Sequence, residues 1–280
     1  MNELIITPAL LTRFRRDLRE REKSAATVEK YLRDAQHFAR FLSGLPADRQ
    51  RILAYKERLR LDYAPASANS MLASLNALLR FMSRADLCVR QLRLQRQTYA
   101  PQSRELTRTE YQRLVRAAKS RGDARLSCLI QTICATGVRV SEVQYITVAA
   151  VHQGEAVVNC KGKLRRIFLV EPLQKLLLGY IRAAGIAEGP VFRTRSGKPL
   201  SRTAIWRAMK SLCREASVPP EKVFPHNLRH LFARIFYDLD KDIAKLADIL
   251  GHSSINTTRI YIATTGAEHR QRMALMRLIL

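Results

Sequence analysis

The stretch that decides the fold runs from His226 to Tyr261 and reads HNLRHLFARIFYDLDKDIAKLADILGHSSINTTRIY. Its first polar residues, His226 and Arg229, are three positions apart, so on a helix they share one face, and His230 follows directly. An apolar helix then leads to Gly251, the residue type that most readily ends a helix in the left-handed conformation. This pattern predicts an active site built on short helices joined by tight turns.

The turn after that glycine supplies two further polar groups. His252 comes at once, and Ser253 and Ser254 are candidate N-caps for another short helix. We expect Tyr261 to lie about two turns along this helix. The stretch therefore offers imidazoles, a guanidinium and a phenol within one small region.

Charge is the most informative global property of the chain. Its 280 residues carry a formal net charge of +25 at pH 7, and the pI is about 10.7. Such a surface attracts a polyanion, and no low-complexity basic tail accounts for it. No apolar run of about 18 residues and no signal-peptide core is present. We therefore expect a nucleic-acid-binding protein of the cytosol or nucleoid, with no membrane partner.

The cysteines indicate neither a disulfide framework nor a zinc site. They are scattered and lack CxxC or Cys/His pairs: Cys88, Cys128, Cys134, Cys160 and Cys213. We expect reduced, mostly buried thiols. Carboxylates spaced for Mg²⁺ are also lacking, which argues against a two-metal nuclease. The sequence thus predicts no metal and no cofactor.

Residues 1–93 are predicted to form a helical DNA-binding domain. Its expected helices cover 8–22, a longer segment capped by Ser24, a segment opened by Pro46 and Ala47, and about 67–84. Each pairs an apolar side with arginines, which suits a module lying across a duplex backbone. Residues 94–105 lose this periodicity and contain Pro101, so we interpret them as a linker.

A second domain, residues 106–280, is predicted to begin with the capping box of Thr107 and Glu110. The segment 124–136 is apolar almost all round and ends at Gly137, which predicts a core helix. Arg139 follows, where an unpaired guanidinium is costly. Two explanations stay open at this point: an anionic ligand, or a structural ion pair with Glu142.

Two β-strands are predicted at 155–159 and 164–170, joined by the turn CKGK, with a third short strand at 189–192. The turn presents Lys161 and Lys163. A lysine at such a tip is most simply solvated, although a mobile tip can also carry a proton donor. Ser201 is expected to cap a helix that places Trp206 in the core.

These residue types suit phosphoryl transfer, which needs charge neutralisation on the phosphate, an in-line nucleophile and a proton for the leaving oxygen. Arg139 and Arg229 are the candidates for holding two phosphate oxygens. A tyrosine can attack and store the phosphodiester bond energy as a phosphotyrosine ester. Lysine or histidine can act as acid or base.

Four motifs carry a family resemblance: ATGVRVSE, the hairpin CKGK, HNLRH and LGHSSINTTRIY, in this order. Together they resemble the catalytic signatures of the tyrosine recombinase, or phage integrase, family over about residues 105–261. The N-terminal helices resemble that family's core-binding domain. The resemblance implies a mainly α fold with a small β-sheet, in which a helical core-binding domain and an α+β catalytic domain form a C-shaped clamp on DNA.

The resemblance assigns a role to each matching residue. Arg139 and Arg229 would clamp the scissile phosphate, and Tyr261 would be the nucleophile. His226 would hydrogen-bond the phosphate and assist proton movement at Tyr261, and His252 matches a position that holds histidine or tryptophan. Glu142 matches a supporting acidic residue, and Lys161 matches the proton donor, chosen over Lys163 because it precedes the glycine. Leu231 departs from the family, many of whose members have a small hydroxyl residue there.

The resemblance also implies an assembly. Four protomers would act on two duplex sites with inverted-repeat cores, exchanging strands through a Holliday junction without ATP or metal, for integration, excision or resolution. It allows accessory DNA-bending proteins and places the protein in the cytoplasm or nucleoid of a prokaryote. The amphipathic segment 266–280 either packs on its own domain or is donated to a neighbouring protomer as an exchange helix.

Two other functions remain open from the residues alone. A type IB topoisomerase shares the arginines and the tyrosine, although the two-domain length and the LGH spacing argue against it; supercoil relaxation without paired sites would distinguish it. A DNA-binding protein with a vestigial site is the other alternative. The presence of every expected functional residue disfavours it.

Overall fold

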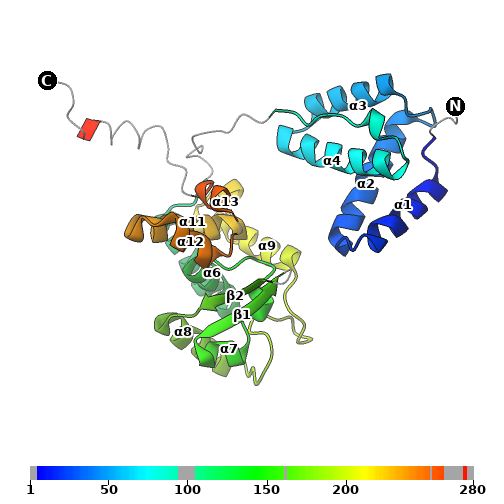
Figure 1. Ribbon diagram of the computed structural model, residues 1–280. Helices are drawn as coiled ribbons and strands as arrows, with labels where there is room; N and C mark the ends of the chain where they lie inside the picture. Colours follow the sequence, from blue (N-terminus) through cyan, green and yellow to red (C-terminus); the bar gives the residue numbers. More distant parts are fainter. Residues whose placement is uncertain (1–4, 94–104, 161–162, 253, 262–273, 276–280) are drawn as a thin grey trace. The chain divides into compact units, whose positions relative to one another are not determined.

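The computed structural model describes residues 5–93, 105–160, 163–252, 254–261 and 274–275. The chain divides into two compact units, Met1–Arg96 and Gln97–Leu280, and most of their helices and both strands are labelled in Figure 1. The predicted mainly helical fold with a small β-sheet is confirmed. The predicted linker falls outside the described residues except for Glu105, and the predicted C-terminal helix does so except for Ala274 and Leu275. Within the described part, no helix is both long and apolar enough to cross a membrane.

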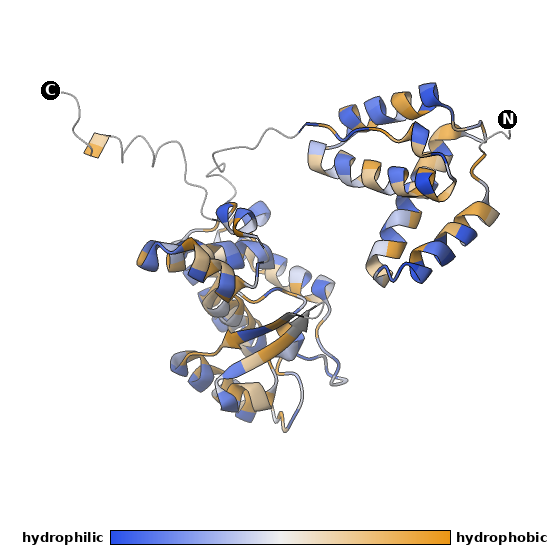
Figure 2. Ribbon diagram, in the orientation of Figure 1, coloured by the Kyte–Doolittle hydropathy of each residue, from blue (hydrophilic) through white to orange (hydrophobic). Residues whose placement is uncertain are grey.

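The N-terminal unit consists of helices whose apolar sides meet in one core. They are α1 (Pro8–Glu20), α2 (Ala25–Leu42), α3 (Arg49–Asp62), α4 (Pro65–Phe81) and the short 3-10 helix η1 (Ala85–Leu87). Large side chains such as Phe14, Phe38 and Tyr55 are fully buried there. Figure 2 shows the resulting division of these helices into polar and apolar sides. Ser24 caps α2 as predicted, accepting the amide N–H of Thr27.

The predicted start of α3 at Pro46 is wrong by a few residues. The helix begins at Arg49 because Asp48 is the N-cap, and its carboxylate accepts the Arg51 amide N–H at 2.8 Å. An aspartate side chain satisfies one of the free donors of a first helical turn, which proline cannot do.

The second unit is built around α6 (Ala124–Thr136), the predicted core helix. Helices α5 (Arg108–Ser120), α8 (Glu171–Ala183) and α9 (Arg202–Ser211) pack against it. The unit also contains η3 (Val143–Tyr145), α7 (Val148–Gln153), α10 (Cys213–Ala216) and η4 (Pro220–Lys222). Both hydrogen bonds of the predicted capping box are present at the start of α5. Three of the cysteines near this core, Cys128, Cys134 and Cys213, are buried free thiols.

The β-sheet of the described chain has two antiparallel strands, β1 (Glu155–Cys160) and β2 (Lys163–Phe168). Their register pairs Val157 with Arg166 and Val158 with Arg165, so alternation buries Arg165 and exposes Val157. The predicted third strand is wrong: in that region Pro190 makes only an isolated bridge with Thr147. Proline has no N–H to continue a ladder.

Trp206, predicted to be in the core, is 47% exposed. The buried residues of α9 are Ile205 and Met209, four positions apart on one face. A residue directly after Ile205 is turned away from that face. The Trp206 ring instead lies 5.2 Å from the Lys210 ammonium, measured to the ring centroid.

The last helices described in this unit are α11 (Pro225–Asp240), α12 (Ile243–Leu250) and α13 (Ile255–Arg259). Gly251 ends α12 with a φ of 63°, as the sequence predicts, and Ser254 caps α13. Tyr261 was expected on this helix but lies two residues beyond its end. These turns bring the predicted site residues of separate helices close to one another.

Gly137 provides a test of the turn that ends α6. An alanine there would combine a φ of 61° with a Cβ only 2.5 Å from Phe232 Cδ1. We expect Gly137→Ala to lower the free energy of unfolding by roughly 1 kcal/mol because alanine disfavours the left-handed conformation, and by about 1–3 kcal/mol more because the added Cβ overpacks the site. Urea-induced unfolding followed by circular dichroism measures this.

Gly185 is the matched control, since it has the same φ of 61° but no atom within 4 Å of its added Cβ. Gly185→Ala should therefore lower the free energy of unfolding only by the cost of the left-handed backbone conformation. Equal losses in the two variants would show that the contact with Phe232 does not constrain this turn.

Candidate active site

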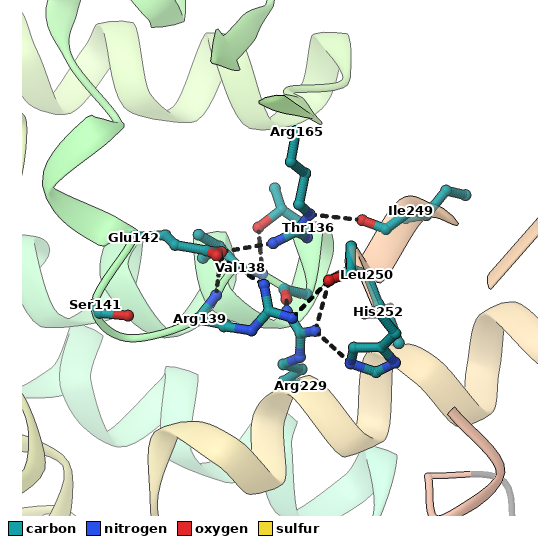
Figure 3. A network of polar contacts seen from close by, with 12 residues as sticks. Thr136, Val138, Arg139, Ser141, Glu142, Arg165, Arg229, Ile249, Leu250 and His252 are labelled. Carbon is teal, nitrogen blue, oxygen red and sulfur yellow. Dashed lines mark hydrogen bonds and ion pairs between the residues drawn. The ribbon is translucent and has the colours of Figure 1, made fainter. Parts of the chain in front are cut away.

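The carbonyl groups at the end of α12 hold three arginines (Figure 3). The carbonyl of Ile249 accepts from Arg165 Nε at 2.9 Å, that of Leu250 from Arg229 Nη2 at 2.8 Å, and that of Gly251 from Arg139 Nη2 at 2.9 Å. The last carbonyls of a helix lack partners within the helix and carry the negative end of its dipole. One helix end therefore positions cations from β2, α11 and the turn after α6.

Glu142 links two of these arginines. Its Oε1 accepts from Arg139 Nη1 at 2.8 Å, and its Oε2 accepts from the Arg139 backbone N–H at 3.0 Å and from Arg165 Nη1 at 2.5 Å. Burial acts to raise the pKa of this carboxyl, but the hydrogen bonds from Arg139 and the charge of Arg165 outweigh it and lower the pKa. Glu142 is thus a buried anion.

The structural ion pair between Arg139 and Glu142 is present, yet it leaves part of the Arg139 side chain accessible to solvent. The Arg139 side chain remains 36% exposed while Glu142 is 2% exposed. An anion can therefore still reach the guanidinium. The structural pair and the anion-binding role are compatible with one another.

Arg229 is only 1% exposed. Its Nη1 donates to the carbonyl of Gly137 at 2.5 Å, and its Nη2 lies 2.8 Å from His252 Nε2. Burial, followed by the charge of Arg139, lowers its pKa to about 10, so it remains charged at neutral pH. Among the described residues its Nε has no acceptor. In the described part of the chain, Glu142 pairs with Arg139 and Arg165 but not with Arg229, so one carboxylate accompanies three guanidinium groups and the cluster has an excess of positive charge.

Tyr261 packs against this cluster and is itself 7% exposed. Its hydroxyl lies 3.4 Å from His226 Nε2, and its ring stacks on His230 with a centroid distance of 4.2 Å and an interplanar angle of 24°. The Arg229 Cζ lies 5.8 Å from the ring centroid, and the His252 ring centroid lies 5.1 Å away. A phenol is therefore enclosed by imidazoles and a guanidinium.

The histidines around the phenol are neutral at neutral pH. Burial, then the charges of Arg229 and Arg139, lower the pKa of His226. Burial and neighbouring groups also lower the pKa values of His230 and His252 to about 4. A neutral His226 can accept the proton that Tyr261 must lose to become a nucleophile.

Comparisons with known proteins agree with this geometry. The model of the phage integrase family matches residues 104–268. The tyrosine recombinase XerD of Xanthomonas axonopodis pv. citri is 30% identical over 279 residues, with 88% of this chain and 89% of the relative covered. The chain belongs to the phage integrase family of tyrosine recombinases.

Solved structures of this family show the same fold. A lambda integrase tetramer bound to a Holliday junction is 19% identical, with a TM-score of 0.72 and coverage of 93% of this chain and 78% of that chain. The XerH recombinase bound to its difH substrate is 17% identical, with a TM-score of 0.69 and coverage of 98% and 90%. At these identities the likeness concerns the fold.

The structure brings together six of the residues that the sequence selects for the site: Arg139, Glu142, His226, Arg229, His252 and Tyr261. Lys161 lies outside the described residues, and Lys163 begins β2. The site of this integrase-family chain therefore combines the turn after α6 with α11, the end of α12 and the segment after α13.

Three residues in the site had no role assigned from the sequence. His230 follows Arg229 directly and stacks on Tyr261. Arg165 alternates inward on β2 and reaches Glu142. Thr258 is buried three positions before the tyrosine. Strand alternation offered a signal for Arg165, whereas the contacts of His230 and Thr258 depend on how the helices pack.

The Glu142 carboxylate provides a pH-dependent test of the cluster. Glu142→Gln should lower the free energy of unfolding by about 3 kcal/mol at pH 7, because it leaves a buried guanidinium without its anion. The folded pKa of Glu142 lies below the unfolded value of about 4.3, so its contribution is present above that pH and is lost as the pH falls through the folded pKa. Urea unfolding between pH 7 and pH 3 should show the difference from wild type shrinking below about pH 4.

Glu171→Gln is the control, since Glu171 and Lys175 form an ion pair whose side chains are 73% and 74% exposed. The free energy of unfolding of Glu171→Gln should stay within about 0.5 kcal/mol of the wild-type value at every pH. If Glu142→Gln behaved like this control, the charge balance described for the cluster would be wrong.

Proposed function

We propose that this protein is a site-specific DNA recombinase that cleaves and rejoins DNA strands through a covalent 3′-phosphotyrosine at Tyr261, using neither ATP nor metal. The observation that carries this proposal is the arginine cluster with excess positive charge beside a buried phenol and neutral imidazoles. A phosphodiester supplies the anion that such a cluster lacks. The family membership supports the same reaction.

In the proposed cleavage step, Arg139 and Arg229 hold the nonbridging oxygens of the scissile phosphate. The Tyr261 oxygen attacks phosphorus, its proton passes to His226, and the bond from phosphorus to the 5′ oxygen breaks. Lys161 donates a proton to that leaving oxygen. Attack by the 5′ hydroxyl of another strand reverses these steps and releases the tyrosine, so no outside energy source is needed.

We further propose roles for the two parts of the chain. Residues 1–93 would form the core-binding domain and residues 106–280 the catalytic domain, joined by the linker 94–105 and closed around the duplex as a clamp. A tetramer would act on two sites with inverted-repeat cores, by analogy with the lambda integrase tetramer bound to a Holliday junction. The segment 266–280 would pack on a neighbouring protomer, and DNA-bending proteins could assist.

Replacing the nucleophile tests the central claim. Tyr261→Phe should form no covalent DNA adduct while binding DNA with unchanged affinity, because only the attacking oxygen is removed. Binding sites can be selected from randomised duplexes with this variant. Wild type is then trapped on nicked versions of those sites and the adduct is measured on denaturing gels.

Tyr145→Phe is the matched control, since Tyr145 is 39% exposed in the same unit, and it should form the adduct normally. An adduct of undiminished yield with Tyr261→Phe would exclude Tyr261 as the nucleophile.

The choice of proton donor can be tested with a substrate whose 5′ bridging oxygen is replaced by sulfur. Lys161→Ala should slow cleavage of ordinary DNA by about 100-fold or more, as expected for loss of a general acid. A thiol has a pKa of about 8.5 and leaves readily as the thiolate, so the sulfur substrate should restore the rate. Single-turnover cleavage measures both rates.

Lys163→Ala is the control for this experiment and should cleave both substrates normally. A slow Lys163→Ala protein that the sulfur substrate rescues, beside a normal Lys161→Ala protein, would transfer the role to Lys163.

A further inference from the structure

Thr258 connects two residues of the candidate active site, His252 and Tyr261. It belongs to α13 and is completely buried. Its Oγ1 lies 2.8 Å from His252 Nδ1, and its backbone carbonyl accepts the N–H of Tyr261 at 2.9 Å. One residue therefore contacts both the histidine and the nucleophile.

The proton position on His252 follows from its two partners. Arg229 Nη2 lies 2.8 Å from His252 Nε2, and a guanidinium can only donate hydrogen bonds. Nε2 must therefore accept. A neutral imidazole carries one N–H, so this proton is on Nδ1 and is donated to Thr258 Oγ1. Which ring nitrogen carries the proton is set by the partner of the other nitrogen.

We infer that Thr258 is a positioning residue for strand cleavage. Its hydroxyl stabilises the Nδ1–H tautomer of His252, the form whose Nε2 can accept from Arg229. Its backbone carbonyl accepts the N–H of Tyr261 and so holds the backbone of the nucleophile. The inference rests on the proposed phosphoryl transfer for its catalytic part. It extends the site to a residue that touches neither the phosphate nor the reacting oxygen.

The order of contacts shows how this support works. Thr258 fixes His252, and His252 in turn accepts from the Nη2 of Arg229, which also donates to the carbonyl of Leu250. Without the hydroxyl, a proton on Nδ1 would be buried with no acceptor at this position, and this cost favours moving the proton to Nε2, facing the guanidinium. Two donors would then oppose each other, and Arg229 would lose one of the contacts that hold its planar group.

Thr257 offers a matched comparison on the same helix. It is the same residue type, one position earlier, and its side chain is exposed whereas Thr258 is buried. Valine has nearly the shape of threonine but lacks the hydroxyl. The pair Thr258→Val and Thr257→Val therefore removes a hydroxyl from the buried and from the exposed side of α13, and Thr258→Ser retains the hydroxyl.

The first measurement is the protonation state of His252 by two-bond ¹H–¹⁵N correlation spectroscopy on the full chain at neutral pH. His252→Phe identifies the signals by their loss. Wild type, Thr257→Val and Thr258→Ser should show a protonated Nδ1 and an unprotonated Nε2. Thr258→Val should show a mixture of tautomers or the Nε2–H form. This measurement does not depend on activity.

The second measurement is single-turnover formation of the covalent adduct on nicked sites. Losing one hydrogen bond that orients Arg229 should slow Thr258→Val about tenfold, with DNA affinity unchanged. Thr258→Ser should recover most of the rate, and Thr257→Val should match wild type. The Ser variant distinguishes loss of the hydroxyl from loss of packing.

Each outcome bears on the inference. An Nε2–H tautomer in wild type, or a Thr258→Val protein whose spectrum and rate both match wild type, would overturn it. A changed tautomer with an unchanged cleavage rate would overturn the positioning role. If wild type itself formed no adduct on any selected site, the proposed function would fail instead, and the tautomer measurement would still decide the assignment of Thr258.

Discussion

The structure of the site depends on the attraction between the free carbonyls at the end of α12 and three arginines. Arg139, Arg165 and Arg229 come from separate elements and would repel one another without this shared partner. The Glu142 carboxylate offsets only part of their charge. A helix end carries negative partial charge without being a full anion, so it can gather the cations and still leave them able to bind a phosphate.

Two glycines make this arrangement possible. Gly137 and Gly251 end α6 and α12 in the left-handed conformation, and each carbonyl accepts from an arginine. A Cβ on Gly251 would lie 2.5 Å from Arg165 Cδ. The turns that end these two helices therefore also place the carbonyls that hold the arginines.

Many of the helices and their ends could be predicted from local sequence patterns, because N-caps, C-terminal glycines and apolar periodicity act within a few residues. The capping box at Thr107, the core helix α6 and the end at Gly251 follow from such patterns. The prediction for Trp206 is wrong because aromatic character does not say which side of α9 faces the core. The contact between Arg165 and Glu142 joins a strand to a turn, and packing that no local spacing encodes decides it.

The enclosure of Tyr261 has a consequence for the lifetime of a covalent intermediate. Its ring packs with Ala233, Leu246 and Leu250, and Phe232 lies against the same cluster. Water has little access to such a surrounding. A phosphotyrosine formed there would be shielded from hydrolysis, so the ester would persist until a DNA hydroxyl was placed to attack it. The apolar wall behind the tyrosine thereby favours strand rejoining over an accidental permanent break.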